Sequence, residues 1–228
     1  METPSQSFDR AIDHITNLLN SANLFFGHGA PEAASEALWI IAYCAGISPS
    51  QALDHLDEPY DTDLFEQAKK IAEQRIQTRS PLAYILKEAW LMGHCFYCDE
   101  RSIIPRSFIA ELITQGTLDD YLPPNGRALD LCTGNGSLAI LLSLNYPDIE
   151  VCASDIDLNA LALAQKNVIS YELTDVIELV HSDLWQDLPE PNEENRYDLI
   201  ICNPPYVNQT SMQNLPAEYL KEPALALD

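Results

Sequence analysis

The sequence predicts an α/β fold in three parts: a small N-terminal helical domain over residues 1–80, a β-hairpin linker over 81–105, and a parallel sheet over 106–228. Two observations carry this prediction. Apolar residues recur at helical spacing in the first part. In the last part, short apolar runs alternate with stretches of helix length, which is the pattern of βαβ units. A chain of 228 residues is long enough to bury a substantial core.

Helices are expected from residue 8 to about residue 78. The first is indicated by apolar residues that share one face: Phe8, Ile12, Ile15, Leu18 and Leu19. The stretch "FFGHGAP" then interrupts the pattern, and a second helix follows over 33–44. Ser48 has the chemistry of an N-cap, with Pro49 at the first position of a short third helix. A fourth covers about 64–76. His28, a lone loop histidine, is expected to be structural.

The rest of the chain reads as a hairpin followed by strands that alternate with helices. The stretch "PLAYILKEAWLMGHCFYCDERSIIP" is rich in aromatic and β-branched residues, which predicts a hairpin. A helix is expected over 107–122, before the turn at 123–126. Four strands are then predicted at 127–132, 149–154, 176–182 and 197–202.

The charge of the chain is strongly negative, with 12 Lys and Arg against 35 Asp and Glu and a formal net charge of −23. Phosphate backbones repel such a surface, so no direct nucleic-acid binding is expected, whereas a basic protein is attracted. The acidity is equally compatible with a role in solubility alone. No apolar run of membrane-spanning length and no signal peptide is seen. We therefore expect a cytoplasmic protein with no membrane partner.

The cysteines do not indicate a metal site. The one suggestive spacing is "HCFYC" at 94–98, but a structural zinc site needs a second pair of ligands, and none is found. If this stretch is a strand, alternation directs Cys95 and Cys98 to opposite faces. No metal is expected.

A glycine turn follows the first predicted strand, in "LDLCTGNGSLAI". Gly134 to Ala139 fits the pattern G-x-G-x-x-G/A after a strand and at the start of a helix, where a ligand can approach the backbone. Asp155 ends the next strand, where a carboxylate can accept both hydroxyls of a ribose. Together they predict a cofactor that contains adenosine. Its predicted contacts in the turn are Cys132, Thr133, Gly134, Asn135 and Gly136.

The residues around the turn favour S-adenosylmethionine (SAM) over a dinucleotide. Asp130 precedes the turn, where an acid suits an ammonium or sulfonium better than a phosphate. Asp183 is placed to accept from the adenine amine, with Leu184 against the ring; a turn-capping role for Asp183 is about equally compatible with the sequence. Asp157 is expected to be a helix N-cap.

The fourth strand runs into "NPPY". In open α/β sheets, ligands bind beyond the carboxyl ends of the strands, so Asn203 is expected both at the cofactor and at the substrate. The Asn203 side-chain oxygen and the Pro204 carbonyl form an acceptor pair for a substrate –NH₂ group. Pro205 stiffens the segment, and Tyr206 offers a flat face to a planar group. A strand stopped by a Pro-Pro turn explains the prolines but not the flanking amide and aromatic ring.

These residues carry a family resemblance. "NPPY" after a glycine turn of this type resembles the class I methyltransferases that act on planar amino or amide nitrogens, and implies a Rossmann-like sheet with SAM as methyl donor. The stretch 81–113 is similar to the protein-glutamine methyltransferases, which carry a helical domain ahead of the catalytic one. "FFGHGAPEA", "IPRS" and "NLPAEYLKEPALALD" are most similar to the branch that modifies ribosomal large-subunit protein three. The resemblance implies that Asn203, Pro204, Pro205 and Tyr206 hold the glutamine amide.

The chain departs from the family pattern in two places. Leu131-Cys132 before the turn is a mild change. The family sheet normally adds three further strands after the fourth, whereas this sequence ends at Asp228. We therefore expect either a C-terminally truncated fragment or a chain that self-associates through the exposed edge of its fourth strand.

Four functions are compatible with the sequence. The leading interpretation is an enzyme that methylates a glutamine on a ribosomal protein, with the helical domain recognising the substrate. The alternatives are glutamine methylation of peptide release factors, methylation of an adenine or guanine amine in nucleic acid, and a truncated binding module without turnover. The negative charge argues against the nucleic-acid alternative.

Overall fold

The computed structural model describes residues 6–190, 192, 195–205 and 215–226, and the chain divides into two compact units. The first joins Met1–Leu86 with Leu215–Lys221, and the second joins Lys87–Asn214 with Glu222–Asp228. The hairpin therefore groups with the second unit. The segment 215–221, here called the returning segment, comes back to the helical unit from far along the chain.

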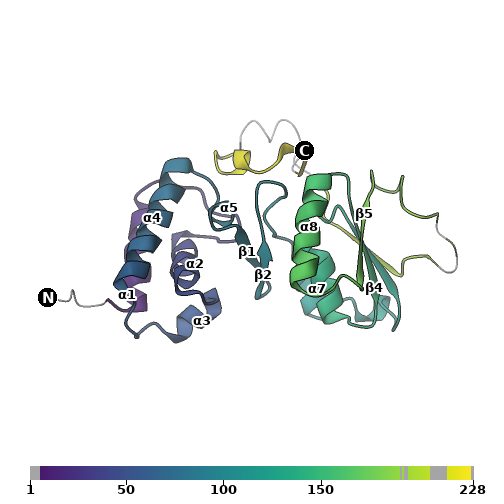
Figure 1. Cartoon of the computed structure of the whole chain (residues 1–228), viewed down its shortest axis with the longest axis horizontal. Coiled ribbons are helices and arrows are strands. Elements are labelled where there is room, and N and C mark those ends of the chain that lie inside the picture. The colour runs from purple at the N-terminus through teal and green to yellow at the C-terminus, as the bar shows by residue number, and fades with distance from the viewer. Residues whose placement is uncertain (1–5, 191, 193–194, 206–214, 227–228) are drawn as a thin grey trace. The chain divides into compact units, whose positions relative to one another are not determined.

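Helices form the first unit (Figure 1): α1 (Phe8–Asn20), α2 (Ala33–Ala45), α3 (Pro49–Asp54), α4 (Thr62–Thr78) and α5 (Leu82–Leu86), with the short 3-10 turn η2 (Tyr219–Lys221). The predicted N-cap at Ser48 is confirmed. Its hydroxyl accepts from the Gln51 N–H at 3.1 Å, and the Gln51 side chain accepts from the Ser48 N–H at 2.9 Å, which is a capping box. No helix in the described residues is both long and apolar enough to span a membrane.

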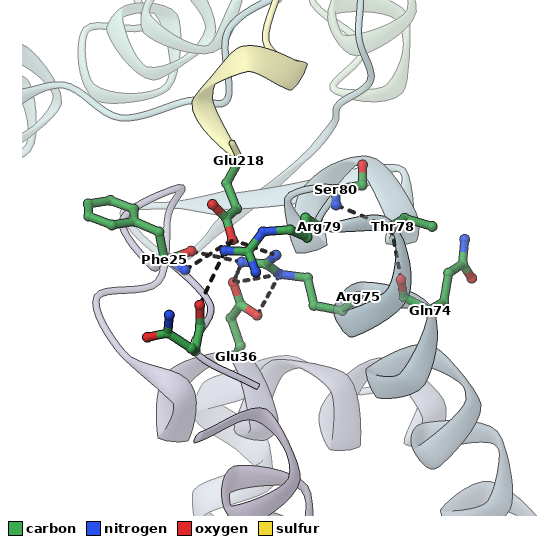
Figure 2. A network of polar contacts seen from close by, with 9 residues as sticks. Phe25, Glu36, Gln74, Arg75, Thr78, Arg79, Ser80 and Glu218 are labelled. Carbon is green, nitrogen blue, oxygen red and sulfur yellow. Dashed lines mark hydrogen bonds and ion pairs between the residues drawn. The ribbon is translucent and has the colours of Figure 1, made fainter. Parts of the chain in front are cut away.

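A buried ion network joins α2, α4 and the returning segment (Figure 2). Arg75 on α4 is fully buried, and its Nε lies 3.0 Å from Oε2 of Glu36 on α2. Its Nη2 donates to the carbonyl of Phe25 at 2.9 Å. Glu218 of the returning segment accepts from the Phe25 N–H at 3.0 Å and pairs with Arg79 at 2.6 Å. The network ties a distant piece of chain to the helices.

Residues 82–86 form the helix α5, so the prediction that the hairpin region begins at residue 81 is wrong for this stretch. Pro81 starts the helix, and its carbonyl accepts from the N–H groups of Tyr84 and Ile85 at 3.1 and 3.3 Å. The fixed φ of proline suits a first helical turn. Most of the short helix is buried, and this burial outweighs the β propensity of its aromatic and β-branched residues.

The hairpin itself is confirmed. Strand β1 (Glu88–Leu91) pairs antiparallel with β2 (His94–Tyr97), and Leu91 is opposite His94. Met92 and Gly93 form the two-residue turn with φ of +50° and +80°. Positive φ at both positions matches the twist of the paired strands.

The second unit is built on a parallel sheet in the order β5-β4-β3-β6. The strands are β3 (Arg127–Leu131), β4 (Glu150–Asp155), β5 (Ile177–His181) and β6 (Leu199–Cys202), in agreement with the four predicted. Leu131 pairs with Ser154 on one side and Cys202 on the other. The segments that leave β3, β4 and β6 therefore start side by side. In the described part of the chain, β6 lies at a sheet edge, with Ile200 47% exposed.

Helices α6 (Phe108–Thr114), α7 (Ser137–Asn145) and α8 (Leu158–Ser170) bury a common core against the sheet face that carries Ala128 and Val151. Figure 1 shows α7 and α8 beside the strands. Leu129 and Cys152 point to the opposite face. The helix expected over 107–122 is shorter than predicted, because the N–H of Thr117 bonds back to the Leu112 carbonyl and ends it. Short 3-10 turns follow at η1 (Asp119–Tyr121) and, near the end of the chain, at η3 (Ala224–Ala226).

Candidate functional site

The glycine turn between β3 and α7 has the conformation that its sequence predicts. Gly134 and Gly136 have φ of +59° and +81°. A Cβ at Gly136 would lie 3.1 Å from the Cβ of Ala164 on α8, so the close approach of α8 also requires glycine. A Cβ at Gly134 would meet only the Cβ of Ser102, at 3.9 Å. The surface of the turn at Gly134 is therefore open to a ligand.

Asp155 lies beside this turn. Its Oδ2 accepts from the Gly134 N–H at 2.8 Å, and its Oδ1 accepts from the Asp157 N–H at 2.9 Å. These two bonds fix the carboxylate, and each oxygen retains a further acceptor site because a carboxylate offers about four lone pairs. The predicted N-cap role of Asp157 is confirmed, since its side chain accepts from the Asn159 N–H. Asp155 is thus rigidly held and can still accept from a ligand.

A pocket opens over the carboxyl ends of β3, β4 and β6. Most of its lining is apolar, and its charged members are Asp155, Asp157 and Arg101. Its lining residues are Arg101, Ser102, Ile103, Cys132, Gly134, Asp155, Ile156, Asp157, Ala160, Asn203, Pro205, Pro223, Leu225 and Ala226. The pocket brings together the glycine turn, the acid that ends β4 and the amide after β6, which are the three elements expected from the sequence.

Asp130 lies beneath the turn and not in the pocket lining. It is fully buried, and its Oδ2 accepts from the Thr133 hydroxyl at 2.6 Å and from the Ala139 N–H at 3.2 Å. Its Oδ1 has no hydrogen-bond partner among the described residues. Burial raises the pKa of Asp130 to about 7. In the structure, Asp130 braces the turn through Thr133; its contact with a bound cation remains a prediction.

Asn135, another predicted residue of the turn, is held by the side chain of Asn167, which the sequence analysis did not identify. Asn167 on α8 is fully buried, and its Nδ2 donates to the carbonyls of Asn135 at 2.9 Å and of Tyr97 at 3.1 Å. Its Oδ1 accepts from the Tyr97 N–H at 2.7 Å. Asn167 therefore ties the hairpin to the glycine turn. An amide within an otherwise apolar helix face was the signal that could have revealed it.

The segment after β6 reaches the pocket. Asn203 is half-buried, and Asn203 and Pro205 both line the pocket, while Pro204 is exposed. Tyr206 lies outside the residues that the structure describes. The amide expected to meet the substrate is therefore in the same pocket as Asp155, and its role stays a prediction.

The structure does not bring Asp183 and Leu184 to this pocket. Asp183 is exposed and accepts from the side chain of Gln186 at 3.1 Å, while its carbonyl accepts the Gln186 N–H. Leu184 is 49% exposed. The bond to the Asp183 carboxylate comes from a side chain and not from a backbone N–H, so the turn-capping alternative and the adenine contact of both residues remain predictions.

Three lining residues come from the loop after the hairpin and were not expected: Arg101, Ser102 and Ile103. Asp99 holds Arg101 with two bonds, 2.8 Å to Nε and 2.7 Å to Nη2. The same guanidinium holds the pKa of Asp99 below its usual value. A charged loop residue after a hairpin gives no pattern of its own, so only the fold reveals its place.

The pocket carries neither a metal cluster nor an activated thiol in the described residues. No group of three or more His, Cys, Asp or Glu among them is placed to hold a metal ion. Burial raises the pKa of Cys132 to about 12, so this thiol is neutral near pH 7 and is not a ready nucleophile. The arrangement is suited to binding and orientation.

Comparison with known proteins assigns the class. The family described as "Methyltransferase small domain" matches residues 111–227, and the "PrmC N-terminal domain" matches residues 12–86. The chain thus carries a methyltransferase domain. A solved structure, the T. Thermophilus 16S rRNA N2 G1207 methyltransferase in complex with AdoMet and guanosine, is 25% identical over 52% of this chain and 32% of that chain, with a TM-score of 0.40.

Curated relatives identify the family. A protein of Burkholderia pseudomallei (strain K96243) is 40% identical over 230 residues, which cover 99% of this chain and 75% of the relative. One of Neisseria meningitidis serogroup A is 42% identical over 210 residues, covering 91% of this chain and 68% of the relative. Both are named ribosomal protein uL3 glutamine methyltransferase. This chain belongs to the ribosomal protein uL3 glutamine methyltransferase family.

Proposed function

We propose that this protein transfers the methyl group of SAM to the side-chain amide nitrogen of a glutamine in ribosomal protein uL3. One observation carries the proposal: a single pocket is lined by Gly134 after β3, Asp155 at the end of β4 and Asn203 after β6. The chain matches its relatives over both its helical and its α/β part, which supports the same activity here.

The residues of the pocket fit the cofactor. Gly134 leaves room above the turn, and Asp155 keeps acceptor sites for the two ribose hydroxyls. Ile156 and Ala160 add apolar surface on the β4 side, which suits the flat adenine ring. When bound, SAM supplies an electrophilic methyl group on a sulfonium.

The substrate side of the proposal rests on Asn203. Its side-chain oxygen and the Pro204 carbonyl accept the two N–H bonds of the glutamine amide and direct the nitrogen lone pair into the pocket. The same acceptors stabilise positive charge as it develops on the nitrogen. Tyr206, outside the described residues, is proposed to stack on the amide plane. The proton leaves to water after the new C–N bond has formed.

The remaining parts of the proposal concern partners. The helical unit is proposed to recognise the substrate, and the net charge of −23 favours a basic ribosomal protein over nucleic acid. A ribosomal substrate is consistent with a reaction in the cytoplasm. Self-association through β6 is proposed from the exposure of Ile200 at the sheet edge in the described part of the chain; sedimentation over a range of concentrations tests it.

The function is tested by incubating the protein with SAM and one of three substrates: uL3, a release factor with its Gly-Gly-Gln motif, or ribosomal RNA. Mass spectrometry of peptides, or of nucleosides for the RNA, then locates any added methyl group. Methyl on a uL3 glutamine is the expected result. Methyl only on the release factor would assign the sister activity, and methyl only on RNA would overturn the proposal. Cofactor binding without transfer to any substrate would mean a binding module.

The role of Asn203 gives a quantitative prediction. Asn203→Ala is expected to lower kcat for uL3 by about 10²–10³-fold, because a group that stabilises developing charge is lost. Asn145→Ala is the matched control, since Asn145 ends α7 and is not among the residues that line the pocket. A loss below threefold for Asn203→Ala would remove this residue from its proposed role.

A further inference from the structure

Arg101 has no role in the reaction proposed above. It lines the cofactor pocket, and it is the only lysine or arginine among the described residues of that lining; the other charged members are Asp155 and Asp157. The rest of the chain is acidic, with a net charge of −23. A single cation in a pocket of this kind is positioned for a ligand group that carries negative charge.

The guanidinium of Arg101 is fixed from one side and available on the other. Asp99 binds Nε at 2.8 Å and Nη2 at 2.7 Å, and the Asp99 carboxylate also accepts the Arg101 N–H at 3.1 Å. Asp99 does not line the pocket, whereas Arg101 does. Nη1 has no hydrogen-bond partner among the described residues, and the side chain is 38% exposed. Arg101 can therefore donate from Nη1 to a second acceptor without leaving Asp99.

The neighbouring residue shows which end of a ligand Arg101 would meet. The Cβ of Ser102 is 3.9 Å from the place of a Cβ on Gly134, so this loop lies over the glycine turn of β3. In the sheet, β3 lies between β4, which ends at Asp155, and β6, which precedes Asn203. A ligand with its ribose at Asp155 and its methyl group toward Asn203 must pass its amino-acid part across that turn.

We propose that Arg101 binds the α-carboxylate of the methionine part of the cofactor. This proposal rests on the cofactor site of the proposed function. A carboxylate brought into a pocket with two aspartates needs a cation, since an unpaired charge is costly to desolvate. A hydrogen bond between guanidinium and carboxylate is charge-assisted and among the stronger ones in proteins. Arg101 is then a residue that binds the one anionic group of the cofactor.

The test compares two ligands that differ in that group. S-Adenosylhomocysteine carries the α-carboxylate, whereas 5′-methylthioadenosine has the same adenosine and thioether but no amino-acid part. Binding of both is measured by calorimetry on the whole chain and on Arg101→Met, which keeps an apolar stem and removes the charge. We expect Arg101→Met to weaken S-adenosylhomocysteine about 10- to 100-fold and to change 5′-methylthioadenosine less than twofold.

Two further variants control the result. Asp155→Asn is expected to weaken both ligands, because both contain the ribose. Arg127→Met removes another ion-paired arginine, 3.2 Å from Glu150 and not among the residues that line this pocket, and is expected to change neither affinity. Arg101→Lys is expected to recover part of the loss.

Three results would overturn the assignment. Equal weakening of both ligands by Arg101→Met would mean that Arg101 supports the adenosine or the loop. Unchanged binding of both would mean that it contacts no part of the cofactor. Binding of neither ligand by the unmodified chain would refute the cofactor site itself, and with it this inference; that result is distinct because it appears before any substitution at Arg101.

Discussion

The two units of this protein hold buried charge in different ways. In the helical unit, Glu36, Arg75, Arg79 and Glu218 each have an opposite charge within ion-pair distance (Figure 2). In the α/β unit, Asp130 is equally buried, but its partners are a hydroxyl and a backbone N–H, and one of its oxygens has no hydrogen-bond partner among the described residues. Asp155, next to it, is tied to the backbone and still faces the pocket.

The difference separates charge that holds the fold from charge near a binding site. The helical network joins α2 and α4 to the returning segment, and removing Arg75 leaves Glu36 without a cation in the interior. The carboxylates of the α/β unit brace a turn and line a pocket, so they keep acceptor capacity. A comparison of variants in the two units should therefore show loss of stability in one and altered titration or binding in the other.

The largest expected effect is on Arg75. Arg75→Met leaves Glu36 buried without its cation, while Glu218 keeps its pair with Arg79. The loss of one partner from a buried ion pair costs about 3–5 kcal/mol. We expect the free energy of unfolding in urea, followed by circular dichroism, to fall by that amount. Arg127→Met, at a pair whose Glu150 is largely exposed, is the control and should cost at most about 1 kcal/mol.

A loss of less than about 1 kcal/mol for Arg75→Met would contradict the structural role of the network. It would mean that Glu36 takes up a proton at little cost once Arg75 is gone. Burial already raises the pKa of Glu36, and Arg75 opposes this effect. The loss of unfolding free energy in Arg75→Met is therefore expected to grow as the pH rises.

The next effect is expected at Asp130, and only over a range of pH. Its pKa is raised from an ordinary value near 4 to about 7 in the folded state. The folded protein therefore holds a proton that the unfolded chain releases, and the stability from this group is present below pH 4 and lost as the pH rises through 7. One pKa unit corresponds to about 1.4 kcal/mol, so the expected loss is on the order of 4 kcal/mol once the group is ionised.

Asp130→Asn tests this directly. The amide cannot ionise, so the stability of the variant minus that of the original chain should increase between pH 4 and pH 8. The difference is obtained from urea unfolding at several pH values. A constant difference would show that Asp130 is already ionised at low pH and that its environment is more polar than the buried geometry indicates.

The smallest effect is expected at Gly136. Gly136→Ala places a Cβ 3.1 Å from Ala164 at a φ of +81°, so both backbone strain and crowding against α8 oppose it, at about 1–3 kcal/mol. Gly93→Ala is the matched control, because Gly93 has a φ of +80° with nothing within 4 Å of its Cβ. The excess of the first variant over the second measures the crowding alone. Equal losses would mean that α8 moves away freely.

Much of the architecture was accessible from local patterns. The four strands, the helices on either side of "FFGHGAP", the Ser48 cap and the glycine turn followed by Asp155 all depend on residues close in the chain. The incorrect prediction for residues 82–86 also came from a local pattern. Residues 82–86 carry β-favouring side chains but form the helix α5, because burial of the segment decides its conformation and is not visible in a short window.

The sequence by itself therefore determined the class of fold, the place of the turn and the amide after the last strand, since periodicity, capping and turn chemistry act between near neighbours. Only the tertiary structure decided that Arg101 enters the pocket, that Asn167 ties the hairpin to the turn, and that Glu218 pairs inside the helical unit. Phe25 and Glu218 bond across 193 residues of chain. Such contacts form only when distant segments pack together, and no local spacing specifies them.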